Sequence, residues 1–516
     1  MFKKVLKIKL KVLGAIFIGL ACAQLISAYF FGIMAEKQLN SQFKHLTKST
    51  LINVVKHDYS RGWFSANETV VLAVNNQVVK NIMSVLPGGA NESAPVLADN
   101  MYQISYTTHI THGLLAGWLH GNLFPTIAYT STHITFSEKL TTILNKFFNG
   151  KKALVIDNIL YLNKAGKYIV YSPAFNYDEA VSGVKVNWGG LVLKVHYNPN
   201  FDKFENFLSI PLFEMFAPTK GAFLFKNFEY SSNSQYSVND IKVGSTNSTL
   251  ASLKIELKDT QALQLKFGQI IHLLTGVNSA DFLNGIDAID PTNFTITNVG
   301  YHSLSNDENG YFNADAKAGF SSLLTNKKKY GPLNFDLGLN HIASADFSKL
   351  LDNLNALGNQ EQTTEEARNK TVAKLKTYFT PILIKNPEVI LHSFYLQTPD
   401  GVIDLSGKAT TQNFVASDIN DQTQFMKKLL VKLDFNIPKP ILAYFFVLQM
   451  KFFLTAGNAQ MDKQSSEALA KVVNILLDNQ IQSWLKKGYL KQDGNLIKSK
   501  ISMESGVLYL NGVTVK

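Results

Sequence analysis

The sequence predicts an α+β, β-rich fold: an extended antiparallel meander of strands and hairpins, with interspersed helices, behind one N-terminal transmembrane helix. Three observations lead to this fold. An uncharged run near the N-terminus is long enough to cross a bilayer. Apolar and polar residues then alternate along many short segments, which is typical of strands with one buried face. Turn sequences that contain glycine join several of these segments into hairpins.

The N-terminal run extends from Val12 to Met34 and carries no formal charge. As a helix it would be roughly 35 Å long, enough for a hydrocarbon core of ~30 Å. Lysines precede it at positions 3, 4, 7, 9 and 11, whereas Glu36 and Lys37 after it balance each other. The positive-inside rule then places the N-terminus in the cytoplasm and the body in the periplasm, as a single-pass protein of a bacterial inner membrane.

Two other interpretations of this run are a cleaved signal peptide and a lipoprotein attached through Cys22. Apolar sequence continues beyond Cys22 as far as Ile33, so cleavage there would leave an exposed apolar tail. An uncleaved anchor is therefore favoured. The anchor helix is expected to continue as a stalk, because apolar residues recur at near-helical spacing at Leu39, Phe43, Leu46, Leu51, Val54 and Val55.

The length of 516 residues exceeds the ~250 to 300 residues at which a single core stops growing, so more than one core is expected. A polar stretch at 358–370 marks the internal boundary. We predict that residues 1–57 form a lysine-rich cytoplasmic tail, the transmembrane anchor and the stalk helix. Residues 58–357 form a β-rich periplasmic region, and residues 358–516 form an α+β periplasmic region.

Strands are predicted wherever apolar residues recur at every second position. Such alternation occurs over 253–257 and over 333–339, and it indicates an antiparallel sheet with one solvent-exposed face. Hairpins are predicted at Gly189-Gly190, Asn309-Gly310, Asp400-Gly401 and Ser505-Gly506, because these residues tolerate the positive φ of tight turns.

Helices are predicted over Ala345–Leu357, over Glu365–Lys385, and from a cap at Ser465 or Ser466 to a stop at Gly488. The segment 441–454 is apolar on all sides but too short for a second span. It predicts a helix buried against the sheet, or else a surface that lines a cleft for acyl chains or touches the bilayer. The candidate contacts with lipid or a partner protein are Tyr444, Phe445, Phe446, Phe452 and Phe453.

Composition argues against nucleic-acid binding and against cysteine chemistry. The net charge is +11, but five of these charges lie in the N-terminal lysine cluster. The remaining bases are nearly all lysine, with arginine only at Arg61 and Arg368, whereas nucleic-acid recognition favours arginine. Cys22 is the only cysteine, so neither an intrachain disulfide nor a cysteine-based zinc site can form.

No nucleotide-binding loop, metalloprotease helix or hydrolase elbow occurs in the sequence. Ser-x-x-Lys spacings occur at Ser41 and Ser182, the first beside the predicted membrane segment and the second on a predicted strand, where residues three apart face opposite sides. The densest histidine group is His109, His112, His120 and His133, which we interpret as structural or solvated. No catalytic, cofactor-binding or metal-binding residue is therefore assigned, and no cofactor is expected.

The segment Tyr59-Ser60-Arg61-Gly62-Trp63-Phe64-Ser65 resembles a motif of the YdgA-like family of bacterial membrane-anchored proteins of unknown function. The resemblance continues through His112-Gly113, Tyr330-Gly331-Pro332-Leu333, residues 387–401, Gly488-Tyr489-Leu490 and residues 506–512. Leu114 stands where the family is expected to have proline. The resemblance implies no biochemical activity. We expect Tyr59, Arg61, Gly62, Trp63 and Phe64 to be structural, with Arg61 and Trp63 holding the stalk to the first strand.

These observations lead to the hypothesis of a non-enzymatic, membrane-anchored envelope protein, either a periplasmic scaffold or a groove that shields lipid between membranes. The alternative is an envelope hydrolase with an unrecognised active site, which would need a concave cluster of titratable residues. The expected partners are the inner-membrane bilayer, a lipid ligand or an envelope protein, and a second copy of the chain. Nucleic acid is not expected.

Overall fold

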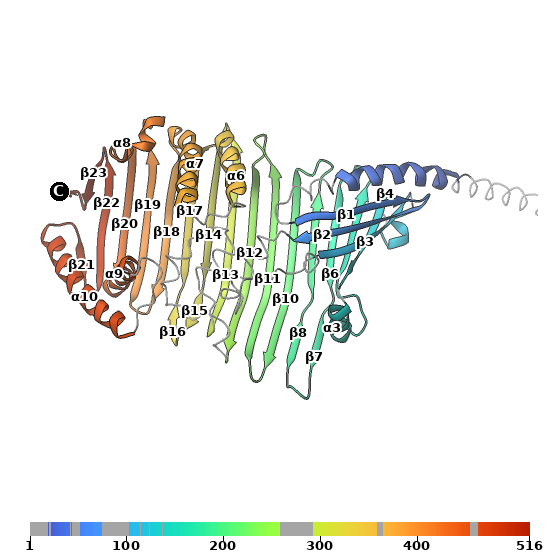
Figure 1. Cartoon of the computed structure of the whole chain (residues 1–516), viewed down its shortest axis with the longest axis horizontal. Coiled ribbons are helices and arrows are strands. Elements are labelled where there is room, and N and C mark those ends of the chain that lie inside the picture. Colours follow the sequence, from blue (N-terminus) through green and yellow to red (C-terminus); the bar gives the residue numbers. More distant parts are fainter. Residues whose placement is uncertain are drawn as a thin grey trace, which may run out of the picture. The chain divides into compact units, whose positions relative to one another are not determined.

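The computed structural model describes residues 19, 22–41, 43, 52–74, 103–113, 115–122, 124–136, 138–258, 293–358, 365–454 and 463–515. It divides the chain into two compact units, coloured along the sequence in Figure 1. Unit 1 comprises Met1–Met83, Glu92–Glu179 and Lys185–Phe213. Unit 2 comprises Ser84–Asn91, Ala180–Val184 and Glu214–Lys516.

Unit 1 is an antiparallel sheet with one long helix, at 22–41, along its N-terminal strands. Its strands are β1 (Ile52–Arg61), β2 (Ser65–Val74), β3 (Gln103–His112), β4 (Thr126–Thr135), β5 (Val155–Tyr161), β6 (Gly166–Ser172), β7 (Phe175–Asp178), β8 (Lys185–Trp188), β9 (Leu191–Tyr197) and β10 (Lys203–Ala217), the last of which continues into unit 2. The ladder runs β1–β2–β3–β4–β5–β6–β9–β10, and β7 pairs with β8. Two short helices complete it, η1 (Trp118–His120) and α3 (Glu138–Phe148).

Unit 2 is a longer antiparallel ladder with helices between its strands. Its strands are β11 (Gly221–Tyr236), β12 (Lys242–Leu257), β13 (Asn293–Glu308), β14 (Tyr311–Phe320), β15 (Ser322–Thr325), β16 (Lys328–Tyr330), β17 (Leu333–Ala343), β18 (Glu388–Thr398), β19 (Gly401–Thr411), β20 (Leu429–Pro438), β21 (Lys491–Asp493), β22 (Leu496–Glu504), β23 (Val507–Leu510) and β24 (Val513–Thr514). The main ladder runs β11–β12–β13–β14–β17–β18–β19–β20–β22–β23. Its helices are α6 (Ser344–Gly358), α7 (Glu365–Ile384), η3 (Ala416–Asn420), α8 (Gln422–Lys428), α9 (Lys439–Leu454) and α10 (Lys463–Lys486).

Three of the four predicted hairpins are confirmed. Glu308 pairs with Tyr311 across Asn309-Gly310, Thr398 pairs with Gly401, and Glu504 pairs with Val507 across Ser505-Gly506. Asn309 and Gly310 both have positive φ, at 55° and 79°, as a type I′ turn requires. The hairpin predicted at Gly189-Gly190 is wrong, because both edges of β9 are occupied, one by β6 and the other by β10.

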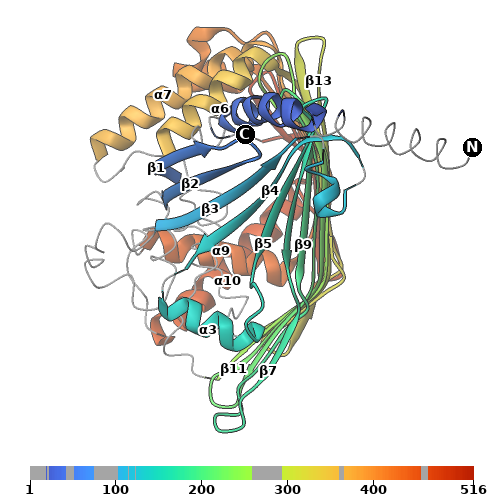
Figure 2. The ribbon, with the colours of Figure 1, turned by 90° about the vertical axis from the view of Figure 1, so that its right-hand side faces the viewer.

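The long helices of unit 2 cover one face of its sheet, as Figure 2 shows from the side. Leu350 of α6 and Ile382 of α7 pack with Phe312 and Ala314 of β14. At the C-terminal strands, α9 and α10 pack against Phe435 of β20. The strand register shows that α6 and α7 cover the same face of the sheet as α9 and α10. One row of directly opposed residues on this face connects β14 to β20 through β17, β18 and β19: Ala314, Leu339, Val389, Ala409 and Val431.

The N-terminal helix differs from the one that was predicted. In the part of the chain that the structure describes, no helix is long and apolar enough to cross a membrane, so the transmembrane helix included in the predicted fold is wrong. Positions 12–18, 20 and 21 of the predicted span lie outside the described residues. Positions 22–34 belong to the helix over 22–41, whose buried stripe packs on the sheet of unit 1.

This buried stripe consists of Ala28, Gly32, Ala35 and Leu39, which recur at intervals of three and four residues. Ala28 and Ala35 are 0% exposed, and Ala35 and Leu39 pack with Ile110 of β3. Small side chains allow the helix to approach the strands closely. On the other side of the helix, Ile26 and Phe30 are exposed. The predicted stalk also changes, since Val54 and Val55 lie on strand β1 and not on a helix.

Candidate lipid-contact face and lysine-lined cleft

The helix-covered face of unit 2 carries a continuous row of apolar residues. Ala318 of β14 is directly opposite Phe335 of β17, which is opposite Phe394 of β18. Phe394 is in turn opposite Leu405 of β19, and Leu405 is opposite Phe435 of β20. Directly opposed residues share a face, so these five side chains form one track perpendicular to the strands. All five are partly exposed.

Parallel rows widen this apolar track. A bulge at His392 of β18 changes the strand register, so that Leu391 and Phe394 face the same side although they are three residues apart. The neighbouring row on one side is Phe320, Leu333, Leu396 and Ile403, and on the other side it is Ala316, Leu337, Leu391, Gly407, Leu433 and Ile501. A similar row, Phe225, Leu253, Ile296 and Leu323, crosses β11, β12, β13 and β15. We call the track and its two neighbouring rows together the apolar face.

Helix α9 contains the residues proposed from the sequence as lipid or partner contacts. Leu442 and Ala443 face the core formed with α10 and β22, whereas Tyr444, Phe445 and Phe446 are exposed. Phe445 is 42% exposed and its ring contacts that of Tyr444 edge to face. Phe452 and Phe453 lie on the last turn of α9, and their side chains are outside the described residues. The helix is thus apolar on both a packed and an exposed side.

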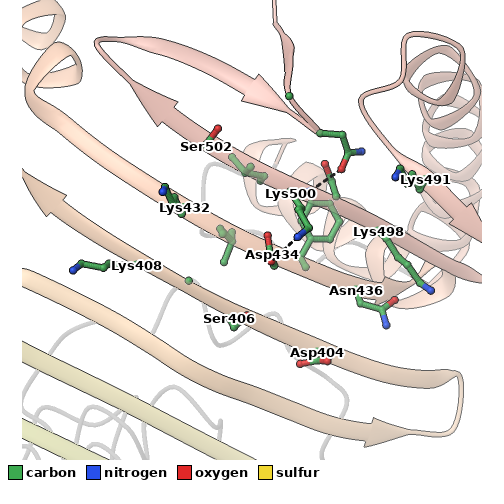
Figure 3. Close-up of a pocket in the computed structure, with 17 residues that line it drawn as sticks. Asp404, Ser406, Lys408, Lys432, Asp434, Asn436, Lys491, Lys498, Lys500 and Ser502 are labelled. Atoms are coloured by element: carbon green, nitrogen blue, oxygen red, sulfur yellow. Dashed lines mark hydrogen bonds and ion pairs between the residues drawn. The ribbon is translucent and has the colours of Figure 1, made fainter.

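The opposite face of the same strands is charged and carries a cleft of about 870 Å³, shown in Figure 3. Lysines dominate its lining, with Lys408 on β19, Lys432 on β20, Lys498 and Lys500 on β22, and Lys491 on β21. All residues of β20 from Lys432 to Asn436 border the cleft. By alternation, the side chains of Lys432, Asp434 and Asn436 share one face, whereas those of Leu433 and Phe435 share the other with Gly407 and Leu405.

Most of the cleft lysines have a carboxylate nearby. Lys408 Nζ lies 2.6 Å from Glu388 Oε1, and Lys498 Nζ lies 2.8 Å from Asp493 Oδ2. The hydrogen bond and the positive charge of Lys498 lower the pKa of the Asp493 carboxyl. Lys500 Nζ is 3.6 Å from Asp434 Oδ2, and the backbone N–H of Lys500 donates to Asn511 Oδ1.

The segment 59–64, which was expected to be structural, holds the N-terminal helix of unit 1 in place. The Trp63 indole Nε1–H donates a 3.1 Å hydrogen bond to the carbonyl oxygen of Leu25, and the Trp63 ring contacts that of Tyr29. Arg61 Nη1 lies 3.2 Å from Glu36 Oε2, and the guanidinium group stacks over Tyr29 at 5.7 Å. Arg61 and Trp63 therefore bind successive turns of the same helix.

The other residues of the segment 59–64 support the turn between β1 and β2 and the core beneath the helix. Gly62 donates its N–H to the carbonyl of Ser65, which closes the turn between β1 and β2. Tyr59 packs against the core of unit 1, and burial is the main cause that raises the pKa of its phenol. Phe64 is exposed, although its carbonyl accepts the backbone N–H of His112.

The four histidines singled out in the sequence do not converge on one site. His112 is 1% exposed and donates from Nδ1 to the carbonyl oxygen of Ala28 at 2.9 Å. His109 is exposed beside Asn67, His120 stacks on Tyr129, and His133 lies 3.3 Å from the Lys152 ammonium group. Among the described residues, no group of three His, Cys, Asp or Glu side chains could hold a metal ion. Ser182 precedes β8, and Lys185 pairs with Asp178.

Sequence reasoning missed the lysine-lined cleft and the stripe at Ala28, Gly32 and Ala35. The stripe could have been found from the sequence, since small residues recur at intervals of four and three within the run interpreted as transmembrane, a pattern typical of a packed helix side. No sequence pattern predicts the cleft, because its lysines come from strands up to 92 residues apart in the chain.

Comparison with known proteins gives a family and no activity. Neither the curated proteins nor the solved structures yield a match. Residues 8–516 match the model of a family described as bacterial protein of unknown function, DUF945. The name of the YdgA-like family stays a resemblance. Since the match covers nearly the whole chain, this protein belongs to the bacterial DUF945 family.

Proposed function

We propose that this chain is a non-enzymatic lipid-binding protein of the bacterial envelope, and that the apolar face of unit 2 shields acyl chains. The observation that supports this function is the row Ala318, Phe335, Phe394, Leu405 and Phe435, which continues across five strands. Its side chains remain partly exposed, whereas a sheet face that only forms a core is buried.

The dimensions of the apolar face fit an extended hydrocarbon chain. Adjacent strands lie about 4.8 Å apart, so five strands place apolar side chains along roughly 19 Å. Burial of hydrocarbon is favourable by about 0.8 kcal/mol for each CH₂ group, and it needs no directional contacts. A row of phenylalanine and leucine side chains without buried charge is suited to this ligand.

Exposed aromatic residues on α9 provide a second apolar surface. Phe445 and Phe446 lie beside a helix core that already buries Leu442 and Ala443, so they are not needed for packing there. We propose that they contact lipid as it enters or leaves the apolar face. Location in the envelope is part of this proposal, and it is supported by the absence of cysteine after residue 22, since a body without thiols has nothing to mispair in an oxidising compartment.

Photo-crosslinking tests the lipid function. Benzoylphenylalanine is introduced at Phe394, on the apolar face, and in a matched variant at Tyr395, the next residue of β18, which faces the opposite side. After irradiation in bacterial cells, we expect lipid adducts by mass spectrometry at position 394 and not at 395. Equal lipid adducts at both positions, or protein adducts alone at position 394, would exclude the proposal and in the second case favour a scaffold.

A C-terminal alkaline phosphatase fusion tests the location. The enzyme requires an oxidising compartment, so we expect activity if unit 2 lies in the periplasm. A fusion that accumulates in full length without activity would place unit 2 in the cytosol and contradict the envelope location.

A further inference from the structure

The lysine-lined cleft of unit 2 lies on the strand face opposite the apolar face, so it is separate from the proposed acyl-chain site. Its floor is formed by β19, β20 and β22, with β21 at one end (Figure 3). We propose that this cleft binds an extended phosphate-bearing anion. The argument rests on the arrangement of its positive charges and on the hydrogen-bond donors between them.

Two cleft lysines have no carboxylate partner within the described part of the chain. Lys432 of β20 is directly opposite Lys408 of β19, and on its other side it faces Ser502 of β22. Like charges placed directly opposite each other destabilise a sheet. Lys491 of β21 is opposite Lys498, which is already paired with Asp493. An anion bound in the cleft would neutralise both unpaired ammonium groups.

The positions of these two lysines define the length of the ligand. Lys498 is opposite Asn436 of β20, so Lys491 lies in the row four residues along β20 from Lys432. At 3.3 to 3.4 Å per residue, the two rows are roughly 13 Å apart. Lys500 is opposite Asp434 of β20, so it lies in the row between them. One orthophosphate ion cannot reach both ends, whereas a molecule with several linked or spaced phosphate groups can.

The groups between the lysines also suit phosphate. Ser406 and Ser502 each offer a hydroxyl donor, and Asn436 offers an amide. An ammonium group donates three hydrogen bonds as a compact charge and binds phosphate without the planar geometry of arginine. Asp404 and Asp434 are the acidic residues of the lining, and Asp434 is paired with Lys500. The lining itself therefore has more positive than negative groups.

Phosphate of this kind can belong to a soluble polyphosphate or to a lipid headgroup, and the experiment separates the two. Binding of the full chain is measured by calorimetry with inorganic tripolyphosphate and orthophosphate, and by flotation with phosphatidylglycerol or phosphatidylcholine vesicles. The test variant is Lys432→Gln with Lys491→Gln. The control is Lys317→Gln with Lys254→Gln, which removes the same charge from the sheet of unit 2 at lysines paired with Asp336 and Glu256.

We expect wild-type protein to bind tripolyphosphate at least tenfold more tightly than orthophosphate, or to float with phosphatidylglycerol and not with phosphatidylcholine. The first outcome assigns a soluble ligand and the second a lipid headgroup. The cleft variant should lose at least tenfold in affinity or lose flotation, the control should keep both, and Lys432→Arg with Lys491→Arg should restore binding. Absence of binding by wild type in all four assays, or equal loss in the control, would refute the site.

Discussion

The imidazole Nδ1–H of His112, at the end of strand β3, donates a 2.9 Å hydrogen bond to the carbonyl oxygen of Ala28, 84 residues earlier in the chain. This bond joins the sheet of unit 1 to the middle of the N-terminal helix. Gly32, one turn further along the helix, makes room for the ring, since a Cβ atom there would lie 2.7 Å from His112 Cε1. The helix is thus held by the hydrogen bond to the Ala28 carbonyl, and the absence of a side chain at Gly32 allows the His112 ring to reach it.

Removal of the His112 side chain should loosen the helix. His112→Ala loses a buried hydrogen bond and leaves a cavity beside Gly32, so we expect about 2 to 4 kcal/mol less free energy of unfolding. Urea denaturation measures this loss, and hydrogen exchange should accelerate over 22–41. His109→Ala, at an exposed position on the same strand, is the control and should change stability by less than about 1 kcal/mol. Equal effects of the two substitutions would contradict the role of His112.

Acid should weaken the same contact. Burial lowers the pKa of His112 from 6.5; the carbonyls of Ala28 and Ser65 oppose this shift, and the positive charge of Arg61 adds to it. The unfolded chain therefore binds a proton at a higher pH than the folded chain, and stability falls as pH decreases below about 6.5. Denaturation from pH 7.5 to 5 should show a larger loss for wild type than for His112→Gln. Parallel curves would show that His112 does not titrate between the two states.

Gly32 should not tolerate a larger side chain. Gly32→Val would press against the His112 ring, and overpacking of this kind costs about 1 to 3 kcal/mol. Gly19→Ala is the matched control on the N-terminal side, because nothing lies within 4 Å of the added Cβ. Alanine favours helix over glycine by about 1 kcal/mol, so this control should preserve or increase stability. Thermal unfolding of both variants measures the difference, and an unchanged Gly32→Val melting curve would refute the close contact.

The exposed aromatic residues of α9 should matter for lipid and not for folding. Phe445→Ser with Phe446→Ser changes two side chains that are about 40% exposed, so the loss of stability should stay near 1 kcal/mol. Lipid that copurifies with the protein, measured by mass spectrometry, should decrease severalfold. By contrast, Ile481→Ala removes a side chain that is 1% exposed in the core between α10 and the sheet, and it should cost about 2 to 5 kcal/mol. Unchanged lipid content in the α9 variant would separate these residues from lipid binding.

Local patterns in the sequence predicted a large part of unit 2. The turns at Asn309-Gly310 and Ser505-Gly506 form where expected because asparagine and glycine accept positive φ without help from distant contacts. The helices expected at Ala345–Leu357 and Glu365–Lys385 appear as α6 and α7, each within a residue of both predicted ends. The same reasoning failed at Gly189-Gly190, where the glycines permit a turn but β6 and β10 already occupy both edges of β9.

The N-terminal run shows a second limit of local reasoning. Hydropathy records that a side chain avoids water, and it does not distinguish lipid from the apolar side of a sheet. The spacing of Ala28, Gly32, Ala35 and Leu39 contains the information that one stripe is packed, but the partner strands lie more than 20 residues away in the chain.

Three hairpin turns and the ends of α6 and α7 follow from the sequence alone, because turn geometry and helical periodicity act within a few residues. The row formed by Phe335, Phe394 and Leu405, and the position of Lys408 opposite Lys432, depend on the folded sheet. The physical reason is strand register: a shift by one residue would exchange the apolar and the lysine faces, and the register depends on pairing between distant segments.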